Sequence, residues 1–451
     1  MLCLLVIIFL CDVPNSMHFL IIYIYVISRF LQVFHIFYLC YIIIFESFFY
    51  FLFFFFWSYC NFTYFISVVG FLHICFLFII IVIFKFVCVE LISVNYTLFN
   101  LILYYLLWVC VGTYWFCMTS SLIIFFFIYE SIQFSAIYIL FSFTKTQRAL
   151  HTALLMGFWT LIGALFLLIA FHCLIIDSEI YTFVDYECHT ISLRFQTQFY
   201  LCLFIGFGVK LPIWPATSWL LQAHVEAPTF WSIFLSGAYI KYPAFGLIFF
   251  FKTALGFYII ILLSVLFCQL IHALCTLIGQ SDLKQIVAAI TICEMQLNLI
   301  FLLLLSVCGF WYWMYFFLAL AINTSFGFWL VDEIAKLFNT REISQISGLS
   351  FENKELSRYI CIYLLCVGGF PGTLVFWLEL FFLMSCLALS GLHAFLIILL
   401  FNLCIISIFF AKWHALLFGQ PIRTTLNFIT VDTFFKYRVC ILFNFFFIFF
   451  I

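Results

Sequence analysis

The sequence predicts an all-α polytopic membrane protein with about fourteen transmembrane helices. Of its 451 residues, 68% are hydrophobic and only 8% are charged, which excludes the soluble globular classes. Apolar runs of about 18 residues or more, each long enough to cross a bilayer, alternate with short polar breaks. The expected spans, in chain order, are 17–35, 36–58, 62–88, 97–118, 121–143, 150–174, 194–213, 229–250, 254–279, 286–309, 311–337, 359–386, 391–417 and 434–451.

The fifth span carries one charged residue, Glu130, near its middle. A carboxylate at that depth is costly, and such groups usually pair with a cation or belong to an ion path. The alternative is a protonated glutamic acid that is held only by hydrogen bonds. We expect the carboxylate to lie within salt-bridge or single-water distance of Lys210, because opposite charges about 4 Å apart gain about 4 kcal/mol at an effective dielectric constant near 20.

The segment 205–243 interrupts the seventh and eighth spans with lysines and prolines. Pro212 has no N–H for the carbonyl of Gly208 and disfavours helix at the residue before it, so the seventh helix should break just after Lys210. A break inside a membrane is stable only where its free backbone groups face protein or a wet cavity. Lys241 lies within the next apolar run. Buried lysines beside a break indicate an ion or proton path; the alternative is that each side chain extends to the membrane surface.

The twelfth span contains a second break, VGGFPGT, which Glu379 follows within two turns. Its place, five spans after the first break, predicts two five-helix repeats of opposite orientation, the fourth to eighth and the ninth to thirteenth spans. Helices interrupted at matching places in two halves are typical of inverted-repeat transporters with sites at mid-membrane. A proline kink that serves only packing is the alternative.

Basic residues are concentrated in the turns after the odd-numbered spans. These residues are Lys85, Lys145, Arg148, Lys284, Lys336, Arg341, Lys354, Arg358, Lys412, Arg423, Lys436 and Arg438. The bias places those turns on the side where the chain is made. The loop after the sixth span is acidic instead, with Asp177, Glu179, Asp185 and Glu187, and should face the opposite side.

Cofactor motifs are absent from the sequence. The 20 cysteines include no C-x2-C pair, so neither an iron–sulfur cluster nor a zinc site is supported. No G-x-G-x-x-G or Walker motif occurs, which argues against nucleotide and flavin binding. We therefore expect no cofactor and no metal in this chain.

The runs VKLPIWP and AHVEAPT, followed by Lys241, resemble the broken seventh and eighth helices of the antiporter-like membrane subunits of respiratory complex I. The resemblance implies N-terminal transmembrane helices at 1–96, antiporter-like repeats at 97–250 and 254–420, and a C-terminal transmembrane helix at 421–451. It also implies a proton path. The residues assigned to this path are Glu130, Lys210, Lys241, Glu294, Glu379, His224 and Glu226.

The implied roles follow the order of the path. Glu130 and Lys210 would form a pair that opens and closes as a proton gate. Lys241 would accept the proton from Lys210 and pass it toward Glu379. The His-x-Glu pair of AHVEAPT would lie at the mouth of the site; its histidine could relay protons, and a helix-capping or loop-bracing role is the alternative.

The chain departs from the family at two places, CEM (293–295) and INT (322–324), where a histidine is usual. Glu294 can still carry a proton, and we expect it to face the polar axis near Lys241 or His272. His272 is otherwise interpreted as a core histidine. Asn323 cannot carry a proton and is expected to position water. The motif SDLKQIVA is interpreted as a helix N-cap and a matrix anchor rather than as chemistry.

The resemblance implies a proton-translocating membrane-arm subunit of NADH:ubiquinone oxidoreductase, whose redox centres lie in other chains. Expected partners are other membrane-arm subunits and lipids, in a hetero-oligomer without nucleic acid. The expected location is the mitochondrial inner membrane; the 70 phenylalanines and an opening without Lys or Arg favour synthesis inside the organelle. The alternatives are a Mrp-type cation/proton antiporter subunit and an assembly subunit with an impaired pump.

Overall fold

The computed structural model describes residues 108–109, 112, 116, 119, 121–143, 146–178, 180–183, 193–251, 257–304 and 310–419. All of them belong to one compact unit, Cys75–Ile451. Helices dominate these residues, and the extended backbone among them forms only isolated β-bridges, at Ser121–Thr182 and Asp282–Glu342. The predicted all-α class is confirmed. The spans expected before residue 97, most of 97–118, the span 434–451 and the acidic side chains after the sixth span lie outside the described residues, so the helix count, domain limits and repeats stay predictions.

The described helices follow the predicted spans closely. The first set comprises α5 (Leu122–Phe143), α6 (Gln147–Ser178), α8 (Leu193–Lys210), α9 (Thr217–Glu226), α10 (Thr229–Phe234), the π-helix η1 (Leu235–Tyr239) and α11 (Lys241–Phe251). The second set comprises α12 (Phe257–Gly279), α13 (Leu283–Leu304), α14 (Phe310–Phe338), the 3₁₀-helix η3 (Ile343–Gln345), α15 (Leu349–Glu352), α16 (Lys354–Val367) and α17 (Leu374–Phe418). Among the described residues, the segments long and apolar enough to cross a membrane are Leu122–Ser142, Gln147–Ile176, Leu262–Gly279, Leu283–Leu303 and Phe395–Phe418.

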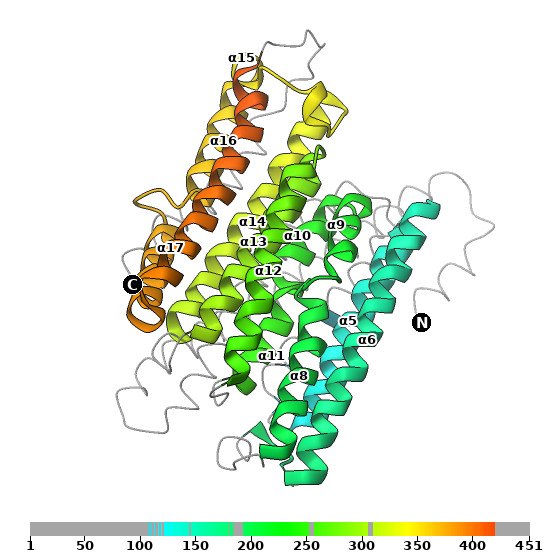
Figure 1. The fold of residues 1–451 in the computed structure, drawn as a ribbon. Helices are drawn as coiled ribbons and strands as arrows, with labels where there is room; N and C mark the ends of the chain where they lie inside the picture. The colour runs from blue at the N-terminus through cyan, green and yellow to red at the C-terminus, as the bar shows by residue number, and fades with distance from the viewer. Residues whose placement is uncertain are drawn as a thin grey trace, which may run out of the picture. The chain divides into compact units, whose positions relative to one another are not determined.

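The packing of α6 against α8 fixes the helix that ends at Lys210 (Figure 1). A Cβ added to Gly163 of α6 would lie 2.8 Å from the carbonyl oxygen of Gly206 in α8. A Cβ on Gly206 would in turn lie 2.7 Å from Leu167. Glycine at both positions therefore permits the close backbone approach of the two helices. The short helix α9 contacts both α6 and α13 and so connects the two sets of helices.

Several basic residues of the predicted odd-numbered turns bind helix ends rather than lying free. The Lys412 ammonium donates hydrogen bonds to the carbonyls of Leu277 at 2.6 Å and Ile278 at 2.9 Å, and to that of Gln280. The last carbonyls of a helix have no partner within it, and a cation there stabilises the helix dipole. Lys412 of α17 therefore caps the C-terminal end of α12.

The predicted twelfth and thirteenth spans are separated at Gly391. The label α17 covers two helices that meet at this residue, whose φ of 82° and ψ of 178° are not helical and lie where φ favours glycine. Glycine occupies this conformation without the steric strain that a Cβ would cause. The boundary predicted between 386 and 391 is thus confirmed, since the helix ends and a new one begins at Gly391.

Candidate functional site

The first helix break lies where the sequence predicts it, because α8 ends at Lys210. Pro212 has no N–H to donate to the Gly208 carbonyl. This carbonyl instead accepts the N–H of Ile213 at 2.9 Å. The Val209 carbonyl accepts the indole N–H of Trp219 at 3.0 Å. The backbone groups freed by the break are thus bound by protein, as a membrane-embedded break requires.

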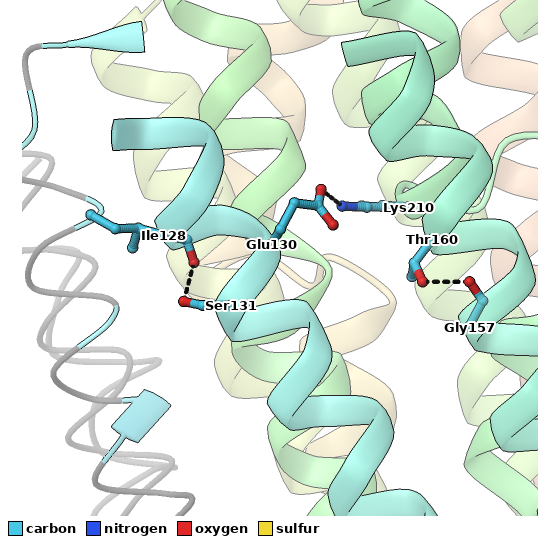
Figure 2. Close-up of polar contacts among 6 residues, drawn as sticks. All are labelled: Ile128, Glu130, Ser131, Gly157, Thr160 and Lys210. Carbon is cyan, nitrogen blue, oxygen red and sulfur yellow. Dashed lines mark hydrogen bonds and ion pairs between the residues drawn. The ribbon is translucent and has the colours of Figure 1, made fainter. Parts of the chain in front are cut away.

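Lys210 forms a buried ion pair with Glu130 of α5. Its ammonium nitrogen lies 2.6 Å from Glu130 Oε1, and Figure 2 shows the two side chains reaching toward each other from their helices. The lysine side chain is fully buried, whereas the Glu130 side chain keeps 24% of its surface exposed. The ammonium also lies 3.9 Å from the ring centroid of Tyr129. The predicted contact is confirmed; its role as a gate is a separate proposal.

Lys241 is buried at the start of α11, with 2% of its surface exposed. Its ammonium donates a hydrogen bond to the carbonyl of Ser236 in η1. In a regular α-helix that carbonyl would accept the N–H of Ile240, but the wider π-turn directs this N–H to Leu235, at 3.2 Å. The span predicted over 229–250 is therefore helical but interrupted. A π-turn breaks it, as the resemblance to a broken eighth helix implies, and provides a backbone acceptor for the lysine.

Glu294 of α13 connects the two halves electrostatically. Its carboxylate interacts with the charges of Lys241 and of Glu379. One carboxylate oxygen, Oε2, is buried without a hydrogen-bond partner among the described residues. The Glu294 carboxylate is therefore coupled electrostatically to both groups, and its place on a polar axis stays a prediction.

Glu379 lies against the second break. Helix α16 ends at Val367 and α17 begins at Leu374, so the predicted interruption is confirmed. Glu379 Oε2 lies 2.6 Å from where a Cβ on Gly369 would stand, and Gly369 has a φ of 57°. Only glycine meets both constraints. The Glu379 carboxylate also forms a hydrogen bond with Asn402, beyond the kink in α17.

The expected position of His224 at the mouth of the site is wrong. The side chain is fully buried, and its ring stacks on Phe328 of α14 with centroids 4.5 Å apart. Neither ring nitrogen has a hydrogen-bond partner in the described part of the chain. The charges of Lys284 and Lys241 act on the ring. His224 thus lies among buried cations, on the face of α9 that meets α14.

Glu226, by contrast, does lie at an opening. It is half-buried and lines a cavity of about 540 Å³ together with Arg148 and His151. The His-x-Glu pair is therefore divided between the interior and this cavity, because residues two apart on a helix do not face the same way.

Lys284 is a buried lysine that the sequence analysis misjudged. The N-cap expected in SDLKQIVA is present, since Asp282 Oδ1 accepts the N–H of Lys284 at 2.8 Å. The Lys284 side chain, however, is 5% exposed, and its ammonium donates to the carbonyl of Ala227 at 2.9 Å. It is therefore not a surface anchor. The usable sequence signal was a lysine directly preceding an apolar span.

His272 and Asn323, the two remaining polar residues considered in the sequence, both lie inside helices. The His272 ring of α12 packs near Trp214 of the first break, with centroids 6.4 Å apart. Asn323 is buried in α14. Among the described residues, no group of three or more His, Cys, Asp or Glu side chains is placed to hold a metal ion. Water positioning by Asn323 and the lack of a cofactor stay predictions.

Sequence comparison matches residues 119–407 to the family described as "NADH:quinone oxidoreductase/Mrp antiporter, TM". NADH-ubiquinone oxidoreductase chain 4 of Paramecium tetraurelia is 33% identical over 268 residues, which cover 58% of this chain. The match covers 56% of that protein, so this chain spans just over half the length of that curated relative. The relatives found are named NADH-ubiquinone oxidoreductase chain 4 or NADH-quinone oxidoreductase subunit M, so the resemblance to an antiporter-like subunit of complex I, and most closely to subunit 4, is confirmed.

Structure comparison finds the same fold. A chain of respiratory complex I from Thermus thermophilus has a TM-score of 0.70 at 13% identity, covering 84% of this chain and 83% of that one. A chain of the Mrp complex from Dietzia sp. DQ12-45-1b has a TM-score of 0.67 at 13% identity, covering 80% and 67%. The family match spans more than half of the chain. The chain belongs to the NADH:quinone oxidoreductase/Mrp antiporter transmembrane family.

Proposed function

We propose that this chain is a proton-translocating membrane-arm subunit of respiratory complex I. The observation that carries the proposal is the buried Lys210–Glu130 pair at the end of a broken helix. Intramembrane ionisable pairs of this kind mark proton and ion paths. Lys241, Glu294 and Glu379 extend the charged groups into the second half of the chain.

In the proposed relay, the Lys210 ammonium is stabilised by the Glu130 carboxylate in one state and loses this partner in the other. While the pair is closed, the Glu130 carboxylate stabilises the ammonium of Lys210. When the pair opens, the buried ammonium is left uncompensated at a cost of about 3–5 kcal/mol. Passing its proton to the Lys241 amine moves the charge to a group that the Ser236 carbonyl and the charge of Glu294 stabilise. The proton then moves toward Glu379 by way of Glu294. His224 and Lys284 are two further buried polar residues, and the charges of Lys284 and Lys241 both act on the His224 ring.

The remaining features of the proposal concern architecture and assembly. The breaks at 211–216 and 368–373 support two inverted five-helix repeats within about fourteen transmembrane helices. The chain would assemble with other membrane-arm subunits and lipids in the mitochondrial inner membrane, as an organelle-encoded protein. NADH oxidation and quinone reduction would occur in other subunits, so this chain contributes to a NADH:ubiquinone reductase without redox chemistry of its own.

A Mrp-type cation/proton antiporter subunit is the second candidate, because the family and the fold include Mrp proteins. Isolation of the native assembly through this chain distinguishes the two. We expect NADH-oxidising activity to co-purify with the chain. A small assembly that exchanges cations for protons and contains no NADH-oxidising activity would instead favour the antiporter. An assembly subunit with an impaired pump would co-purify with that activity but tolerate loss of Lys210.

Replacing Glu294 by glutamine should lower the proton-to-electron ratio and change its pH dependence. The amide keeps the shape of the side chain but cannot carry a proton between Lys241 and Glu379. Proton uptake and NADH oxidation would be measured together in sealed vesicles between pH 6 and 8. This range spans neutral pH, and a proton carrier is most efficient when its pKa lies near the operating pH. Glu342→Gln, at an exposed position, is the matched control. An unchanged ratio and pH profile in Glu294→Gln would remove Glu294 from the path.

A further inference from the structure

Two buried tyrosines lie with the two lysines of the first half. Tyr129 directly precedes Glu130 on α5, and Tyr239 ends η1 two residues before Lys241. Neither side chain is exposed. Neither hydroxyl has a hydrogen-bond partner among the residues that the structure describes. The pair thus presents two buried polar groups that packing does not require.

The hydroxyl groups are costly where they stand. A buried hydroxyl without a partner destabilises the fold by about 1–3 kcal/mol. Phenylalanine would fill either position with almost the same volume and no such cost, and it is the residue this chain uses 70 times. Tyr129 itself packs against Phe207 and Phe125, with ring centroids 5.7 and 6.1 Å away. A tyrosine within a phenylalanine cluster points to a use for its oxygen atom.

Contacts place Tyr129 against Lys210 and connect Tyr239 to the segments that carry both lysines. The Lys210 ammonium lies 3.9 Å from the ring centroid of Tyr129. The Tyr239 ring packs edge-on against Trp219 at 6.2 Å, and Trp219 binds the carbonyl of Val209 beside Lys210. The charge of Glu130, the partner of Lys210, acts on both phenols, and Tyr239 acts on Tyr129. At the other end, the turn that Tyr239 completes also holds the ammonium of Lys241, through Ser236.

We propose that Tyr239 bridges proton transfer between Lys210 and Lys241, with the Tyr129 hydroxyl as a supporting group on the Lys210 side. This inference rests on the proposed function. The Lys210 ammonium gives a proton to the Tyr239 oxygen, directly or through one water, as the phenol gives its own proton to the Lys241 amine. Lys210 becomes neutral, Lys241 becomes charged and Tyr239 is unchanged. Rotation of its hydroxyl resets the bridge, and no further reactant is needed.

The test replaces Tyr239 by phenylalanine in the assembled complex in sealed membrane vesicles. The ring and its contact with Trp219 remain, and only the oxygen is lost. We expect coupled proton transfer to slow by about tenfold, because one positioned proton carrier is removed and water replaces it poorly. The solvent deuterium isotope effect on coupled turnover should rise, since proton transfer becomes rate-limiting. Tyr129→Phe should give the same changes to a smaller extent.

Tyr200→Phe is the matched control, because Tyr200 is a buried tyrosine of α8 about 15 Å along the helix from Lys210. A packing defect alone would lower the amount of assembled complex without changing the isotope effect. Lys210→Ala is measured in the same vesicles. Normal coupled rate and isotope effect in Tyr239→Phe, with pumping lost in Lys210→Ala, would overturn the bridge alone. Normal pumping in Lys210→Ala would overturn the proposed function itself.

Discussion

Lys210→Ala should abolish proton pumping by the complex. The variant removes the cation that pairs with Glu130, so the proposed gate would have no ammonium to hold or release. NADH oxidation in uncoupled membranes should fall less, because the chain carries no redox motif. The measurement is the proton-to-electron ratio in sealed vesicles beside NADH oxidation in the same vesicles after uncoupling.

Assembly must be separated from transfer in this experiment. Removing one member of a buried pair costs about 3–5 kcal/mol, whereas removing both charges is often close to neutral. The double variant Glu130→Gln, Lys210→Met should therefore assemble normally and still fail to pump. Lys354→Ala removes an exposed lysine and should retain the wild-type ratio. A normal ratio in Lys210→Ala would show that this lysine is structural.

Lys241→Ala should also abolish pumping, although it leaves the Glu130–Lys210 pair intact. The proton released from Lys210 would find no amine to accept it, and Glu294 would lose the cation with which it interacts. The substitution leaves the Ser236 carbonyl without the ammonium that binds it, so complex abundance should be measured with the ratio. Proton-to-electron ratios and single-turnover proton uptake would be compared with those of Lys354→Ala.

The two lysine variants should differ in one respect. Lys241→Ala should still take up a proton at Lys210 in a single turnover and then stop, whereas Lys210→Ala should take up none at this site. Steady pumping at the wild-type ratio in Lys241→Ala would exclude this lysine from the path and leave the transfer beyond Lys210 without its proposed acceptor.

Features set by local chemistry could be predicted from the sequence. The break after Lys210 follows from Pro212, because proline has no N–H to donate to the carbonyl four residues earlier, that of Gly208. The break before Glu379 follows in the same way from closely spaced glycines and a proline. The pairing of Glu130 with Lys210 was also predictable. Few charges occur in these spans, and opposite charges in an apolar environment are stabilised when they pair.

Features set by distant partners could not be predicted. Lys284 belongs to a polar turn in the sequence, and its burial depends on the Ala227 carbonyl, 57 positions away. The π-turn before Lys241 contains no proline to mark it. His224 was expected at the mouth of the site because it belongs to the His-x-Glu pair, but the helix directs the side chains of His224 and Glu226 to different sides. The tyrosine hydroxyls became notable only once their burial was known.

The end of α9 is held by cations from two other segments. Arg341 donates to the Val225 carbonyl at 3.1 Å, and Lys284 donates to the Ala227 carbonyl at 2.9 Å. Hydrogen bonds from charged donors contribute about 1.5–3 kcal/mol each, so α9 does not shift independently of α13 and the loop after α14. A displacement that began at the Lys210 break would thus be carried into the second half as rigid-body motion. By thermodynamic reciprocity, a change of charge in the second half alters the energy of that break to the same degree.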